Sequence, residues 1–227
     1  MSTTVPSETT STPQTRPAPA GRAWALSGLG AAVSGGAGIW FSLAVSPPYE
    51  TGTLLTPEAV VGHYTTVVPQ LLGFHVTTVL AAVLLLPFAA GLYRRLASRT
   101  PGGSLHGLVA MLGLVVLSAV LVLGSGLNTE FVFGFLTPEM LVPSDASFYS
   151  HWVATISWLW VTAGVSGLAV GVAALRHGAA GRGLGVASLA LGGLTLLLGV
   201  SPLQYMAGFV GPLLLLVLAV AMLRNRS

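Results

Sequence analysis

Residues 68–92 read VPQLLGFHVTTVLAAVLLLPFAAGL, and this stretch decides the class of protein. It carries no Asp, Glu, Lys or Arg over 25 residues, and about 20 apolar residues are enough to cross ~30 Å of hydrocarbon. In lipid, only a helix or a closed barrel satisfies the hydrogen bonds of its own backbone. We therefore predict a membrane-spanning helix over residues 68–92.

The rest of the chain repeats this pattern. Of its 227 residues, 53% are hydrophobic and 7% are charged, whereas roughly 25% are charged in an ordinary soluble domain. So few charges cannot cover a water-facing surface, which excludes a soluble globular protein. Five further apolar stretches predict spans, so the fold class is an all-α, polytopic membrane bundle of six transmembrane helices. The predicted spans are residues 23–45, 68–92, 105–125, 152–175, 183–200 and 205–223.

The basic residues predict the topology. All nine are Arg, and with six spans all nine fall on one side of the membrane, whereas five of the six acids fall on the other. The positive-inside rule then places both termini in the cytoplasm. The use of Ala, Gly, Val and Arg without Lys suggests a bacterium of high G+C content, so we expect the bacterial plasma membrane. The arginines form no basic patch, so we expect no nucleic-acid partner.

The chain divides into a tail and a membrane domain. Residues 1–21 are rich in Ser, Thr and Pro, which predicts a disordered cytoplasmic tail, and residues 22–227 form the six-helix transmembrane domain. Connections longer than about 12–15 residues are usually functional or disordered. We expect the two long outer ones, residues 46–67 and 126–151, to fold back over the outer face. Short helices are predicted in them at 57–64 and 138–142.

A motif recurs in these two connections. Residues 55–58 and residues 136–139 both read Leu-Thr-Pro-Glu, at an offset of 81 residues that also relates several span edges. Duplication of one helical hairpin would give a parallel repeat, with both copies crossing the membrane in the same direction. Helix capping is a second explanation, because Thr, Pro and Glu are each favoured where a helix starts.

His75 is the ionisable residue that lies well inside a span, and such groups are candidates for function. One interpretation is an imidazole that is hydrogen-bonded between helices, and the other is a group that binds a ligand or handles protons. A membrane enzyme could use Glu130, Glu139 and His75 as acid–base groups on the outer face. His63, His75 and His151 could instead bind zinc or copper, since imidazole suits both metals.

Aromatic residues also concentrate on the outer side. Trp and Tyr at a membrane boundary usually form an interfacial belt, but they could also line a pocket for a lipid or isoprenoid chain. The residues expected to line such a pocket are Trp40, Gln70, Asn128, Phe131, His151, Trp152, Trp158 and Gln204.

Small residues recur four apart in two of the spans. Such stripes let helices approach closely, either within the bundle or between the protomers of a homo-oligomer. The two stripes are Gly28, Ala32 and Gly36, and Ala163, Gly167 and Gly171. The chain has no Cys and no Walker, Rossmann, HExxH or GxSxG pattern, so we expect no cofactor and no metal centre.

The arrangement of six short helices, a long first outer connection and a second helix ending Gly-Leu-Tyr-Arg-Arg-Leu at residues 91–96 resembles bacterial six-helix integral membrane proteins of unknown function. This resemblance implies the fold and no activity. The two Pro-Glu motifs are also similar to the Pro-Glu-Glu motifs of membrane carotenoid cyclases. Each motif here has a single Glu and falls in a loop, so no catalytic role is carried over.

These observations predict a non-catalytic binding, accessory or carrier component of the membrane. Its expected partners are membrane lipids and a hydrophobic small molecule. The alternative is a membrane-embedded, cyclase-like enzyme that acts on a lipid or isoprenoid substrate in an acidic and aromatic pocket at the outer face.

Overall fold

The computed structural model describes residues 22–47 and 55–224. Every regular element in these ranges is helical, which confirms the all-α prediction. The predicted tail, residues 1–21, lies outside the described residues.

Long helices form a bundle, and shorter segments connect or extend them. The long helices are α1 (Ala23–Val45), α3 (Val68–Ala97), α4 (His106–Ser125), α7 (Val161–His177), α8 (Arg182–Val200) and α9 (Ala207–Arg224). The shorter segments are α2 (Pro57–Thr66), α5 (Asn128–Leu136), the 3-10 helix η1 (Pro138–Met140), α6 (Pro143–Ile156) and the 3-10 helix η2 (Gln204–Met206). With α5 counted as part of α4, and α6 as part of α7, six helical segments are long and apolar enough to cross a membrane. This agrees with the six predicted spans and marks a multi-pass membrane protein.

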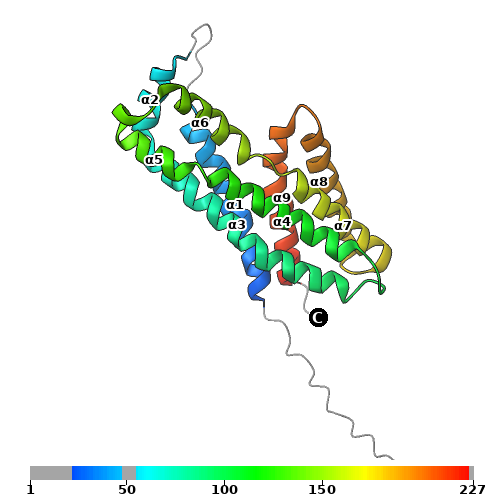
Figure 1. Cartoon of the computed structure of the whole chain (residues 1–227). Helices are drawn as coiled ribbons and strands as arrows, with labels where there is room; N and C mark the ends of the chain where they lie inside the picture. The colour runs from blue at the N-terminus through cyan, green and yellow to red at the C-terminus, as the bar shows by residue number, and fades with distance from the viewer. Residues whose placement is uncertain (1–21, 48–54, 225–227) are drawn as a thin grey trace, which may run out of the picture.

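The long helices pack as neighbours in an up-and-down bundle. α1 contacts α3 and α9, α4 contacts α3 and α7, and α8 contacts α7 and α9. Figure 1 shows that α1 begins and α9 ends at the same end of the bundle. The connections α3–α4 and α7–α8 lie there too, so we call it the arginine end. Its described arginines are Arg22, Arg94, Arg95, Arg99, Arg176, Arg182 and Arg224.

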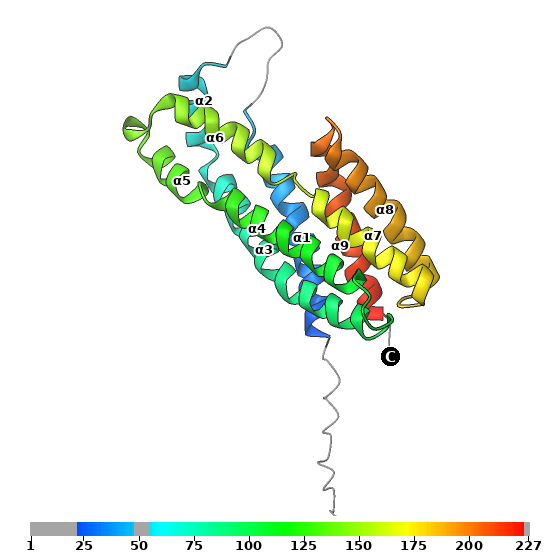
Figure 2. The same cartoon turned by 45° about the vertical axis from the view of Figure 1, so that its right-hand side comes forward.

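At the opposite end, α2, α5, η1 and α6 form a helical cap. Figure 2 shows the cap projecting past the ends of α8 and α9. The structure differs here from the loop expected at residues 126–151, because α5 prolongs α4 and α6 leads into α7. Phe131 and Phe135 share one face of α5 and bury it against Tyr149 of α6. The described acids all lie in this cap: Glu58, Glu130, Glu139 and Asp145.

The two Leu-Thr-Pro-Glu motifs fold differently. Thr56 Oγ1 accepts a hydrogen bond from the Ala59 N–H (3.3 Å) and caps α2, which confirms a helix at the first motif. The second motif begins only the three-residue helix η1, and Thr137 Oγ1 donates to the Phe133 carbonyl (3.1 Å). Helix capping therefore accounts for the first motif, and duplication stays a prediction.

The predicted span 152–175 is interrupted between α6 and α7, at residues 157–160. Irregular backbone is tolerated at membrane depth only where protein surrounds it. Here Trp158 and Trp160 are buried, and the Ser42 hydroxyl of α1 bonds both to the last turns of α6 and to the break itself. That hydroxyl donates to the Val153 carbonyl (2.9 Å) and accepts from Trp158 Nε1 (3.2 Å).

The stripes of small residues pack mostly inside this chain. A side-chain carbon at Gly28 would meet the Phe88 ring, and one at Gly167 would lie 2.8 Å from Leu214. Gly36 has open space around it, with nothing within 4 Å of an added carbon. A homo-oligomer formed through these faces stays a prediction.

We predict that Gly35→Ala destabilises the protein by about 1–3 kcal/mol, because overpacking forces buried neighbours to shift. The added methyl would lie 2.6 Å from the Trp160 ring, which closes the break between α6 and α7. The adjacent Gly36→Ala is the matched control, because its methyl meets open space. Thermal unfolding in one detergent measures both variants, and equal midpoints would contradict the packing described here.

Candidate functional site

Three helices bring a buried polar cluster together where the cap joins the bundle. His75 comes from α3, Asn128 is the first residue of α5, and Tyr149 lies on α6. The Tyr149 hydroxyl donates to Asn128 Oδ1 (2.9 Å), and Asn128 Nδ2 lies 3.5 Å from His75 Nδ1. Asn128 and Tyr149 are fully buried, and His75 is half-buried. The amide therefore links the imidazole to the phenol.

Aromatic rings close over this cluster. Phe131 stacks on Tyr149 with ring centroids 4.3 Å apart, and Tyr64 stacks on Phe135 at 4.9 Å. Tyr64 also meets the Tyr149 ring edge-on at 5.8 Å. Stacked and edge-on ring pairs add stability beyond the area they bury. The hydrogen bonds of this cluster connect α5 and α6 of the cap to α3 of the bundle, and we call the cluster the joint.

The structure brings together three of the residues predicted for the outer site, namely His75, Asn128 and Phe131. Gln70 lies one turn before His75 on α3, and its buried Oε1 has no hydrogen-bond partner in the described part of the chain. Trp152 donates from Nε1 to the Gly124 carbonyl (2.8 Å), which ties α6 to α4. Trp158 lies elsewhere, in the break between α6 and α7.

The remaining predicted site residues are exposed. They are Trp40, Glu130, Glu139, His151 and Gln204. The buried group that faces His75 is thus the Asn128 amide, and the two carboxylates lie on the surface of the cap. Their catalytic roles stay predictions, because an exposed carboxylate alone does not define a site.

The three histidines proposed as metal ligands have separate surroundings. His63 Nε2 lies 3.1 Å from the Val45 carbonyl, His75 faces Asn128, and His151 is exposed. Among the described residues, no group of three or more His, Cys, Asp or Glu could hold a metal ion. The metal interpretation therefore has no support in the geometry.

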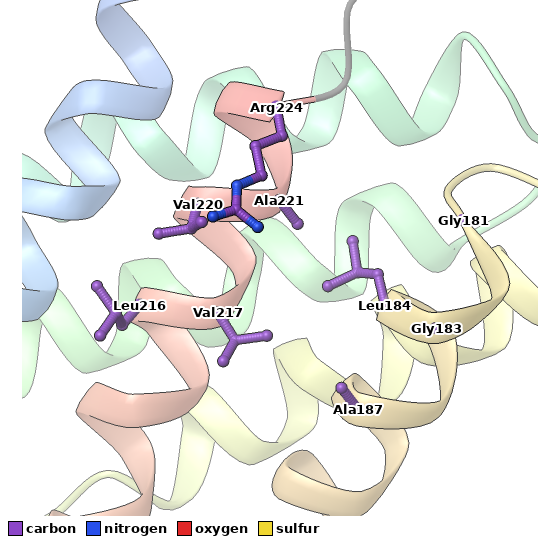
Figure 3. Close-up of a pocket in the computed structure, with 9 residues that line it drawn as sticks. All are labelled: Gly181, Gly183, Leu184, Ala187, Leu216, Val217, Val220, Ala221 and Arg224. Atoms are coloured by element: carbon purple, nitrogen blue, oxygen red, sulfur yellow. The ribbon is translucent and has the colours of Figure 1, made fainter.

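A groove lies between α8 and α9 at the arginine end (Figure 3). Its volume is about 590 Å³, and it is open on one side. Gly183 and Ala187 of α8 face Val217 and Ala221 of α9 across it, and Arg224 lies at its mouth. Small side chains on both walls leave this space between the helices.

Sequence reasoning missed this groove. The glycines and alanines that line it are of the same types as those that pack helices together. A carbon added to Gly185 or Gly192, on the same helix, would lie 2.8–2.9 Å from atoms of α7. Residue type alone therefore does not distinguish a packed face from an open one.

We predict that Tyr149→Phe destabilises the protein by about 1–3 kcal/mol, because it leaves a buried amide oxygen without its donor. The matched control is Tyr205→Phe, because the Tyr205 hydroxyl is exposed and 3.4 Å from Thr155 Oγ1. That change should cost less than about 0.5 kcal/mol. Thermal unfolding of the purified proteins measures both, and a Tyr149→Phe variant as stable as the wild type would argue against the joint.

Comparisons with protein-family models, with curated proteins and with solved structures found no match to this chain.

Proposed function

We propose that the protein is a non-catalytic, multi-pass component of the bacterial plasma membrane that binds a lipid or another hydrophobic small molecule. The groove between α8 and α9 is the observation that carries this proposal. Its volume of about 590 Å³ falls within the range of ordinary ligand sites, roughly 300–1,000 Å³. Because it is open between two helices, a chain could enter it directly from the bilayer.

The lining of the groove supports binding rather than catalysis. Its one ionisable side chain is Arg224, and the others are Gly, Ala, Val and Leu. A guanidinium stays protonated in proteins, so it cannot serve as a general acid or base. Glu130, Glu139 and His75, the acid–base groups of the enzyme alternative, lie at or near the cap, at the other end of the bundle.

The proposed orientation places the arginine end and both termini in the cytoplasm. It is supported by the separation of charge along the bundle, with the described arginines at one end and the described acids in the cap. Basic residues near span ends set the orientation of membrane proteins. Residues 1–21 would then form a cytoplasmic tail.

We also propose that the first four long helices arose from two copies of a hairpin. An offset of 81 residues moves α1 onto residues 104–126, close to α4, which runs from His106 to Ser125. The same offset moves the end of α3, at Ala97, to within a residue of the end of α7, at His177.

We predict that Ala187→Trp blocks binding in the groove. Labelling of α8 and α9 by a photoactivatable phosphatidylcholine should fall about threefold or more, because an indole ring fills the space that a chain would occupy. Leu197→Trp is the matched control, because it lies on the same helix but is 65% exposed and lines no part of the groove. Peptide mapping by mass spectrometry measures the labelling, and equal labelling of both variants would argue against the site.

The absence of Cys from the chain allows a direct test of the orientation. Ser144, in the first turn of α6, and Ser98, just after α3, are both exposed. In intact bacterial cells, a membrane-impermeant maleimide should label Ser144→Cys. It should label Ser98→Cys only after the cells are permeabilised. The reverse pattern would show that the arginine end faces outward.

A further inference from the structure

We propose that the groove between α8 and α9 selects an anionic glycerophospholipid, whose acyl chain lies in the groove and whose phosphate meets Arg224. This inference rests on the proposed function, because it names the class of molecule that the same groove would bind. It is carried by the position of Arg224, the charge around it and the apolar lining behind it.

Arg224 is placed to hold a head group at the mouth of the groove. It is exposed and is the last residue of α9. Figure 3 shows its side chain turned back along the helix, so that the guanidinium lies beside Val220 and Ala221. A guanidinium presents a planar fork of donors that matches phosphate oxygens in pairs. The same side chain therefore borders the apolar space and offers donors to an anion.

The wall formed by α8 adds positive charge at the same level. α8 begins at Arg182, and Gly181 before it provides no side-chain cap for the first N–H groups. Those N–H groups carry the positive end of the helix dipole. Arg182 itself lines an adjacent groove with residues of α7. Arg224 on α9 and the first N–H groups of α8 thus both favour an anion. Arg224 is the main contributor, and the end of α8 adds to its effect.

No described carboxylate competes for these groups at the arginine end. Glu58, Glu130, Glu139 and Asp145 all lie in the cap, at the far end of the bundle. The charge that Arg224 offers to the membrane is therefore available to a lipid phosphate. Basic residues between helices at the cytoplasmic side are suited to anionic head groups.

The shape of the groove favours a lipid over a free anion. From Arg224 to Leu216 its lining follows α9 over eight residues, about 12 Å of helix at 1.5 Å per residue. That distance covers most of one leaflet, since the hydrocarbon core is about 30 Å thick. A free phosphate would leave this apolar wall empty, whereas an acyl chain would cover it.

Purified full-length protein in detergent, mixed with equal amounts of POPG and POPC, tests the proposal. The two lipids carry the same acyl chains, and native mass spectrometry counts each one bound. Wild-type protein should bind POPG about fivefold better than POPC, which is the effect expected of one arginine near an anionic head group. Arg224→Gln should bring this ratio close to one.

Arg94→Gln is the matched control, because it removes an exposed arginine from the same end of the bundle but on α3. It should keep the wild-type ratio. Arg224→Lys keeps the charge and should keep most of the preference, which separates loss of the head-group contact from unfolding. A ratio unchanged by Arg224→Gln, or lowered equally by Arg94→Gln, would overturn the proposal.

A fourth variant tests the acyl chain. Ala221→Trp fills the groove below Arg224 and should reduce the binding of both lipids, because Ala221 lines the apolar space. POPG binding equal to that of the wild type would show that the phosphate is held without the groove, which overturns the proposal.

The outcomes also separate this inference from the proposed function. Photoactivatable phosphatidylcholine has no net charge, so its labelling of the groove tests the apolar space and not the preference for a net anion. If Ala187→Trp blocks that labelling while Arg224→Gln leaves the POPG to POPC ratio unchanged, the groove binds hydrophobic molecules and the anionic preference is refuted. If phosphatidylcholine does not label the groove, the proposed function itself is refuted.

Discussion

Inside the hydrocarbon layer no water reaches a peptide N–H or C=O, so each of these groups needs a partner in the protein. Long helices satisfy this requirement within themselves, and the architecture of the bundle follows from it. The break at residues 157–160 is the instructive exception. It is enclosed by protein, because its residues Trp158 and Trp160 are buried and the Ser42 hydroxyl of α1 bonds to it and to α6. The glycines facing those indoles, such as Gly35, give the rings the room they need.

The same requirement explains which parts of the fold could be predicted from sequence. A stretch without charge, such as residues 68–92, has one stable solution in lipid, so the long helices could be predicted. In the cap, the helix at the first Leu-Thr-Pro-Glu motif could be predicted from its capping residues. The extension of α4 by α5 could not, because Asn128, Thr129 and Glu130 at its start are typical of a loop. The interruption before α7 escaped prediction as well. It depends on a contact with α1, and hydropathy carries no signal for a partner more than 100 residues away.

In the candidate sites, too, some residues could be predicted from sequence and their contacts could not. His75 could be singled out because an imidazole within a span is unusual, but its partner Asn128 is 53 residues away and depends on how α4 and α5 pass α3. The two residues meet beneath stacked rings, at the joint between cap and bundle. The groove lies at the opposite end. Residue types do not reveal the groove, because the same small side chains line open spaces and closely packed faces between helices.

An arginine at the end of a membrane helix can set the topology or bind a phosphate, and these two effects can be separated physically. For the topology, only the side of the membrane on which an arginine lies matters, so Arg94 and Arg224 have the same effect. For binding a lipid phosphate, the position of the arginine matters, because its guanidinium must reach the anion while the acyl chain remains in an apolar space. Arg224 meets this second condition, since it lines the groove together with Val220 and Ala221. In the proposed orientation and binding mode, the charge of Arg224 would therefore act in both ways.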